Sequence, residues 1–135
     1  MTLAAPAYLA ARGTPVRPDD LAQHDCIIDL NFPDPLRWPY QGQTVPVAGR
    51  LRFSDASACL AAAERGLGIA CMPEFVALAA LARGTVVPLL DDFAPDPLPL
   101  SVLYPPGRQV PLKMRVLIEE LAARFAGGLP KVMGY

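Results

Sequence analysis

The chain has 135 residues, which is enough for one domain and too few for two domains of ordinary size. Hydrophobic residues make up 53% of it and charged residues 19%, a balance that indicates a folded core and excludes a disordered chain. The formal net charge is −1 with acids and bases mixed along the chain, so we expect no direct nucleic-acid contact by these residues. No apolar run is long enough to span a bilayer, and the N-terminus lacks the pattern of a signal peptide. These features predict a cytoplasmic protein without membrane contact.

Few residues of this chain are suited to catalysis or metal binding. The three cysteines, Cys26, Cys59 and Cys71, form no C-x-x-C pair and are expected to be reduced thiols. His24 is the single histidine, and Ser54 is not surrounded by a nucleophile elbow. We therefore predict no catalytic residues, no metal, no cofactor and no enzyme activity. A redox pair of Cys59 and Cys71 is the less favoured alternative, because buried cysteines mostly act as small hydrophobic residues.

Proline and glycine divide the first half of the chain into short units. A proline at the first helical position and a glycine just past the end are typical helix boundaries. Prolines exclude a helix from residues 31–49, where irregular or edge strands are expected. The predicted elements are a short helix from Pro6 to Gly13, a second from Pro18 to near His24, a buried strand at Cys26–Leu30, edge strands around Trp38 and Val45–Val47, and a half-buried strand at Arg50–Phe53.

The second half shows helical and strand patterns in alternation. Ala56, Cys59, Leu60 and Ala63 recur at helical spacing and predict an amphipathic helix that ends at Gly66. The elements expected after it are a strand at Gly68–Met72, a helix from Pro73 to Ala82 closed by Gly84, strands at Thr85–Leu90 and Leu100–Tyr104, a break at Pro105–Gly107, and a last helix from near Pro111 to Gly127–Gly128 with an apolar stripe of Met114, Leu117, Ile118, Leu121 and Phe125. Alternating helices and strands predict an α/β fold.

Several short motifs, in order, resemble the substrate-binding domain of LysR-type transcriptional regulators. They are Ala5-Pro6-Ala7-Tyr8-Leu9-Ala10; Gly13-Thr14-Pro15 with Pro18-Asp19-Asp20-Leu21 and His24; Trp38; Phe53-Ser54-Asp55 with Leu60-Ala61-Ala62-Ala63; Gly66-Leu67-Gly68-Ile69-Ala70 with Pro73; and Leu81-Ala82-Arg83-Gly84 with Val86-Val87-Pro88-Leu89. The first departs from the family pattern at Ala5, where serine is usual. Together the motifs span residues 5–126.

The resemblance implies a periplasmic-binding-protein-like fold of type II, with a mixed sheet flanked by helices, in an incomplete two-lobe domain. Residues 5–106 would form the second lobe and its crossover strands, residues 107–128 a helix that normally returns to the first lobe, and residues 129–135 a tail. The opening units of the first lobe and the winged helix-turn-helix would lie outside this chain. The implied function is to sense a small effector, expected to be anionic, in the cleft between lobes and so modulate DNA binding by the full-length protein. A transport solute-binding protein of the same fold is the alternative.

Five residues are candidates for effector binding. Ser54 and Asp55 stand where a strand ends and a helix begins; a helix N-terminus there can hold an anion, and either residue can be the N-cap. Asn31 and Phe32 follow the Cys26–Leu30 strand and are expected at the same edge, Asn31 as a donor and Phe32 as an apolar wall; an ordinary Asx turn explains them equally well. Met72 ends the next strand, where core packing is the simpler explanation.

The last helix gives a prediction about assembly. Its apolar stripe normally packs on the first lobe, and an exposed stripe of this kind favours association. We expect it to dock on a second copy, giving a dimer, or to fold back on its own body.

Overall fold

The computed structural model describes residues 1–96 and 111–125. The chain divides into two compact units, Met1–Asp96 and Pro97–Met133. Of the second unit, the structure describes one helix, α4. The predicted strand at Leu100–Tyr104, the break at Pro105–Gly107, the glycines at 127–128 and the tail lie outside the described residues.

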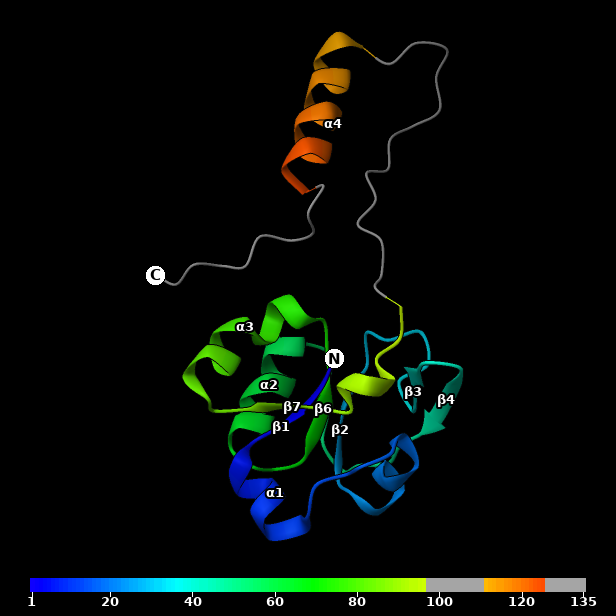
Figure 1. The fold of residues 1–135 in the computed structure, drawn as a ribbon, viewed down its shortest axis with the longest axis vertical. Coiled ribbons are helices and arrows are strands. Elements are labelled where there is room, and N and C mark those ends of the chain that lie inside the picture. Colours follow the sequence, from blue (N-terminus) through cyan, green and yellow to red (C-terminus); the bar gives the residue numbers. More distant parts are fainter. Residues whose placement is uncertain (97–110, 126–135) are drawn as a thin grey trace. The chain divides into compact units, whose positions relative to one another are not determined.

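A five-stranded sheet forms the centre of the first unit, with the strand order β5-β2-β6-β1-β7 (Figure 1). β2 is parallel to both β5 and β6, whereas β1 is antiparallel to both β6 and β7. The predicted α/β class with a mixed sheet is therefore confirmed. The strands are β1 (Thr2–Ala4), β2 (Cys26–Asp29), β5 (Arg52–Phe53), β6 (Ile69–Cys71) and β7 (Val87–Leu89).

Helices α2 (Ala56–Glu64) and α3 (Glu74–Arg83) cover one face of this sheet (Figure 1). Successive side chains of a strand point to opposite faces, so each strand gives alternate residues to each side. Leu3, Ile27 and Ala70 point to the helical face and pack with buried residues of α2 and α3. As predicted, Cys59 and Ala63 lie on the buried side of α2, both 0% exposed.

The neighbouring strand residues point to the opposite face, which is covered by the short helix η1 (Pro18–Gln23) and the hairpin of β3 (Arg37–Tyr40) and β4 (Gln43–Pro46). Trp38 and Val45 are direct partners across this hairpin and are 1% and 2% exposed. The strands expected around Trp38 and Val45 are thus confirmed. Their pairing with each other, separate from the main sheet, was not predicted.

Most helix boundaries follow the proline and glycine signals. Helix α1 (Pro6–Arg12) is capped by Gly13, and α3 ends at Gly84, whose φ of 70° is in the left-handed region that glycine favours. At the start of η1, the Asp20 carboxylate accepts backbone hydrogen bonds from Val16 and Arg17, both 2.8 Å, and these bonds lower the Asp20 pKa. Strand β1 was not predicted.

Helix α4 (Leu112–Phe125) begins and ends close to its predicted bounds. Leu112, Val116 and Leu117 are 73%, 55% and 50% exposed, so the helix carries large apolar side chains on its surface. Within the described residues, no helix combines the length and the apolar character needed to cross a membrane.

Candidate functional site

The carboxyl ends of three parallel strands meet at one edge of the sheet. Ile28 of β2 is level with Arg52 of β5, and Ile27 is level with Ala70 of β6. The residues that directly follow these strands therefore emerge side by side. In open α/β sheets, ligands bind in the crevice beyond this edge. We call it the carboxyl edge.

Asn31 is held firmly at the carboxyl edge. Its backbone N–H and its Nδ2 both donate to Asp29 Oδ1, each at 2.9 Å, and Nδ2 also donates to the Ser54 carbonyl oxygen at 2.8 Å. Asp29 is 4% exposed, so its carboxylate forms a buried anchor for the turn after β2. The predicted Asx turn is confirmed, and the same amide links the ends of β2 and β5.

Asp55, and not Ser54, caps helix α2. The Asp55 carboxylate accepts from the Ser57 N–H at 3.0 Å, and the Asp55 carbonyl accepts from the Cys59 N–H at 3.1 Å. The expectation that Ser54 is the N-cap is therefore wrong. Ser54 lies in the connection between β5 and α2, where its carbonyl oxygen accepts a hydrogen bond from Asn31 Nδ2. Both residues are exposed, and they lie beside Asn31 as predicted.

Phe32 and Met72 belong to opposite faces of the sheet. Phe32 is partly buried and packs against the core cluster under the hairpin. Met72 is 1% exposed and lies in the cluster beneath α2 and α3, where its N–H donates to the Met1 carbonyl at 3.0 Å. Asn31, Ser54 and Asp55 are thus brought together on the surface. The Met72 side chain fills the core, which agrees with the packing explanation.

The carboxyl edge carries acidic side chains. Beyond Asp29 and Asp55, it includes Glu74 in the first turn of α3, a helix whose N-cap, Pro73, has no capping side chain. Burial, reinforced by the charges of Asp29 and Asp55, raises the pKa of the nearby Cys59 thiol to about 11. The exposed carboxylates of Asp55 and Glu74 can accept hydrogen bonds from a ligand.

A family model of the LysR substrate binding domain matches residues 1–126 of this chain. The chain belongs to this family. Among curated relatives, an uncharacterized HTH-type transcriptional regulator of Haemophilus influenzae is 30% identical over 82% of the chain, and the regulator PtxR of Pseudomonas aeruginosa is 30% identical over 90%. The chain spans 40% of the length of each of these relatives. Both relatives are named as transcriptional regulators. These names do not favour the alternative of a transport solute-binding protein.

Solved LysR structures share the fold. The LysR-type regulator CrgA from Neisseria meningitidis matches with a TM-score of 0.65 and 26% identity, over 71% of this chain and 34% of that one. The regulatory domain of AphB from Vibrio vulnificus, treated with cumene hydroperoxide, matches with a TM-score of 0.70 and 26% identity, over 91% and 64%. The predicted family and its periplasmic-binding-protein-like fold are confirmed.

The cysteines of this LysR domain are arranged for packing. Cys26, Cys59 and Cys71 are all free and buried. Cys59 lies in the cluster beneath the helices and Cys71 in the cluster under the hairpin, so the sheet separates the two thiols. Burial also raises the pKa of Cys26 to about 12. A disulfide between Cys59 and Cys71 would require the sheet to open. In the part of the chain that the structure describes, no three His, Cys, Asp or Glu side chains gather as a metal site.

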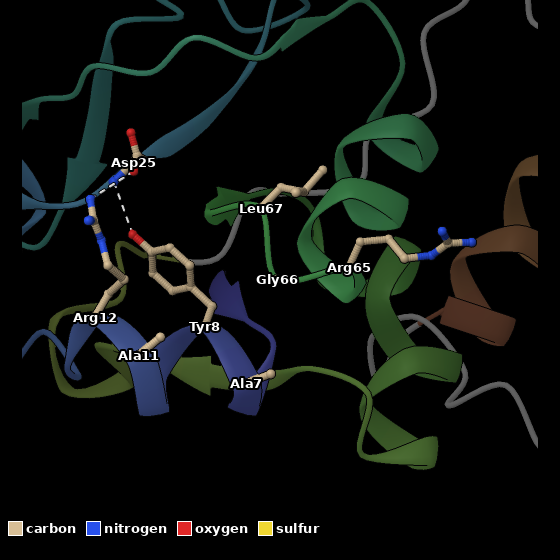
Figure 2. Close-up of a pocket in the computed structure, with 8 residues that line it drawn as sticks. All are labelled: Ala7, Tyr8, Ala11, Arg12, Asp25, Arg65, Gly66 and Leu67. Carbon is tan, nitrogen blue, oxygen red and sulfur yellow. Dashed lines mark hydrogen bonds and ion pairs between the residues drawn. The ribbon is translucent and has the colours of Figure 1, made fainter.

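The opposite edge of the sheet carries an open depression of about 360 Å³ that sequence reasoning missed (Figure 2). On one wall of this depression, Tyr8 Oη accepts a hydrogen bond from the Asp25 N–H at 3.0 Å, and the Asp25 carboxylate pairs with Arg12 at 2.9 Å. The polar groups of this wall are therefore already engaged with one another. A second depression of about 330 Å³ adjoins it, sharing Asp25 and Leu67. The helical spacing of Ala7, Tyr8 and Ala11 is the signal that could have located this wall.

Proposed function

We propose that this LysR domain binds a small-molecule effector at the carboxyl edge, with Asn31, Ser54 and Asp55 in contact with it and Phe32 as an apolar side wall. The observation that supports this assignment most is the Asn31–Ser54 hydrogen bond, which gathers polar groups from two strand ends at the crevice side of an α/β sheet. The relatives' names support a regulatory setting.

Effector binding would regulate transcription through the rest of a longer, cytoplasmic protein. The effector shifts the domain between two arrangements, and the DNA-binding part, supplied outside this chain, responds. The free energy available for the shift is the difference in effector affinity between the two arrangements. This role needs no catalysis and no direct contact between these residues and DNA.

A thermal-shift screen tests the effector role. The purified chain is heated with amines, amino acids, carboxylates and sugars, and a concentration-dependent rise in Tm identifies a ligand. Asn31→Ala, compared with its own ligand-free Tm, should lose that rise. Leu67→Ala, at the opposite edge, should keep it. Loss in the Leu67 variant with retention in the Asn31 variant would move the site to the depression of Figure 2.

We also propose that helix α4 mediates self-association into a dimer. Its stripe of Met114, Leu117, Ile118, Leu121 and Phe125 recurs at helical spacing, and Leu117 is 50% exposed. Sedimentation velocity should show a mass that rises with concentration. Replacing both Leu117 and Ile118 with Gln should abolish the rise, whereas Val116→Gln, on the other side of the helix, should preserve it. A wild-type monomer at every concentration would contradict this role.

A further inference from the structure

We infer that the hairpin of β3 and β4 is a flap that opens away from the sheet. In this device the base of the hairpin remains attached to β2, and the tip is released by the segment that follows β7. The flap is separate from the proposed effector site and does not depend on it. Two local features make the closed flap costly: a buried indole N–H without a partner and a backbone residue held under strain.

The base and the tip of the hairpin are attached to the rest of the unit in different ways. At the base, the Cys26 N–H of β2 donates to the Ala48 carbonyl at 3.0 Å, so the strand order of the sheet holds this end. At the tip, within the described residues, a single backbone hydrogen bond runs from the Gln41 N–H to the Phe93 carbonyl of η2 (Asp91–Phe93) at 2.9 Å. The base can therefore serve as a hinge. We call Leu90 and η2 the latch.

The closed flap leaves a donor without a partner. Trp38 is 1% exposed, and its Nε1–H has no acceptor in the part of the chain that the structure describes. Such a buried N–H loses the hydrogen bond that it would make to water in an open state. Tyr40, on the same face of β3, differs because its Oη shares a hydrogen bond of 2.7 Å with Thr2 Oγ1. Opening would return a hydrogen bond to Trp38 at the expense of its apolar contacts and of the Tyr40–Thr2 bond.

The latch begins at a strained residue. Leu90 has a φ of 59° and is the one residue other than glycine with a positive φ among those that the structure describes. A leucine stays in this region only where surrounding contacts hold it, and strain of this kind gathers at segments that switch. Here Leu90 and Phe93 pack against the core cluster under the hairpin, and the Gln41–Phe93 bond adds to this packing. Release of the latch would let Leu90 relax to a negative φ.

The latch lies where the chain leaves the first unit. η2 ends at Phe93, shortly before Asp96, the last residue of the unit Met1–Asp96. A displacement of the chain beyond Asp96 would therefore act on the latch before it acts on the main sheet. The flap would respond by opening or closing over Trp38.

Hydrogen exchange of the 135-residue chain, followed by NMR, tests the flap. The indole proton of Trp38 is compared with the backbone amide proton of Ile28, which bonds to the Leu51 carbonyl at 3.0 Å in the main sheet. Each rate is expressed as protection relative to the unfolded chain. We expect Trp38 to be at least about tenfold less protected than Ile28 and its exchange to depend little on urea, because a flap exposes less surface than global unfolding. Equal protection with equal urea dependence would show that the hairpin opens only when the whole unit unfolds.

Two substitutions at Gln41 test the hydrogen bond of the latch. Gln41→Pro removes the N–H that donates to Phe93. The turn accommodates proline, because Gly42 has a φ of +74° and Gln41 has no positive φ, as in a type II turn. Gln41→Ala retains the N–H. We expect the Trp38 indole proton to exchange about tenfold faster in the proline variant than in the alanine variant, still with little dependence on urea. Equal rates in the two variants would overturn the latch.

A second pair of variants tests the strain at Leu90. Leu90→Gly and Leu90→Ala both remove the packing beyond Cβ, but only glycine adopts a φ of 59° without strain. Because opening lets this residue relax, the closed flap should gain more from glycine than from alanine. The Trp38 indole proton should then exchange about fivefold more slowly in the glycine variant. An equal rate, or a slower one in the alanine variant, would mean that Leu90 keeps its conformation on opening and would contradict the inference.

Discussion

The Asn31 side chain donates to the backbone carbonyl of Ser54 across the ends of two parallel strands, at 2.8 Å. Ser54 directly follows β5, and Leu30 alone separates Asn31 from the end of β2. The bond therefore links β2 and β5 beyond the last backbone hydrogen bond between them. It also fixes the entry into α2, because Asp55, the cap of that helix, is the next residue.

Replacing Asn31 should weaken the fold as well as the site. Asn31→Ala removes the side-chain bonds to Asp29 and Ser54 and leaves the buried Asp29 carboxylate with fewer donors. We expect the free energy of unfolding to fall by about 1–3 kcal/mol, measured by urea denaturation. Gln23→Ala, at an exposed position on η1, is the control and should change it by less than about 0.5 kcal/mol. Equal effects would contradict the anchoring role of Asn31.

Because Asp55 caps α2, substitutions of Asp55 and of its neighbour Ser54 should differ in their effect on stability. Asp55→Ala should lower the free energy of unfolding by about 1 kcal/mol, because it removes the acceptor of the Ser57 N–H. Asp55→Asn should nearly preserve stability, since asparagine caps as well as aspartate. Ser54→Ala should be close to neutral. A larger loss from Ser54→Ala than from Asp55→Ala in thermal unfolding would reverse the assignment.

The buried Cys59 thiol should make the domain less stable in alkali. Its pKa rises from an ordinary 9.0 to about 11 in the folded chain. The unfolded chain therefore loses this proton first, so the stability that the neutral thiol provides is complete below pH 9 and is lost as the pH rises toward 11. The slope for one proton is at most about 1.4 kcal/mol per pH unit.

Urea unfolding under reducing conditions, from pH 7 to 11, measures this loss. The stability difference between wild type and Cys59→Ala should be constant at neutral pH and shrink in alkali. Tyr40, whose pKa burial also raises, contributes equally to both proteins and cancels in the comparison. Parallel pH profiles would mean that the Cys59 thiol titrates normally in the folded chain.

Gly68 should tolerate no side chain. A Cβ there would overlap the Asp25 carbonyl oxygen and come within 3.2 Å of Ile27 Cγ1, where β6 begins beside β2. Gly68→Ala should lower the free energy of unfolding by about 1–3 kcal/mol in urea denaturation. At Gly42 a Cβ would meet nothing within 4 Å, but φ is +74°. Gly42→Ala should therefore cost only backbone strain, about 1 kcal/mol. A smaller loss at Gly68 than at Gly42 would show that β6 can move away from β2.

Local signals predicted most of the fold. Pro6, Pro18, Gly13 and Gly84 act on their own neighbours, so their effect on helix ends is visible in the sequence. Strand β1 could not be found in this way. Thr2–Ala4 is too short to show a period, and it becomes a strand only because β6 and β7 pair with it.

The proximity of three candidate residues was predicted, but not the contacts that each of them makes. The strand ends brought Asn31, Ser54 and Asp55 together because parallel strands share an edge. The hydrogen bond from Asn31 to the Ser54 carbonyl joins segments 23 residues apart, so local sequence patterns could not reveal it. Met72 was assigned from its place after a strand, but alternation turned its side chain into the core.

The place of β1 between β6 and β7 has a consequence for biosynthesis. β1 is translated before the other strands of this sheet, yet Leu89, the partner of Thr2, belongs to β7, the last of them. The sheet is complete only after β7 has been translated, and until then β1 can pair with β6 alone, so one side of its backbone has no partner in the sheet. A nascent chain paused before β7 would hold a sheet with β1 at its edge, and the unpaired side of Thr2–Ala4 would be open to pairing with another strand.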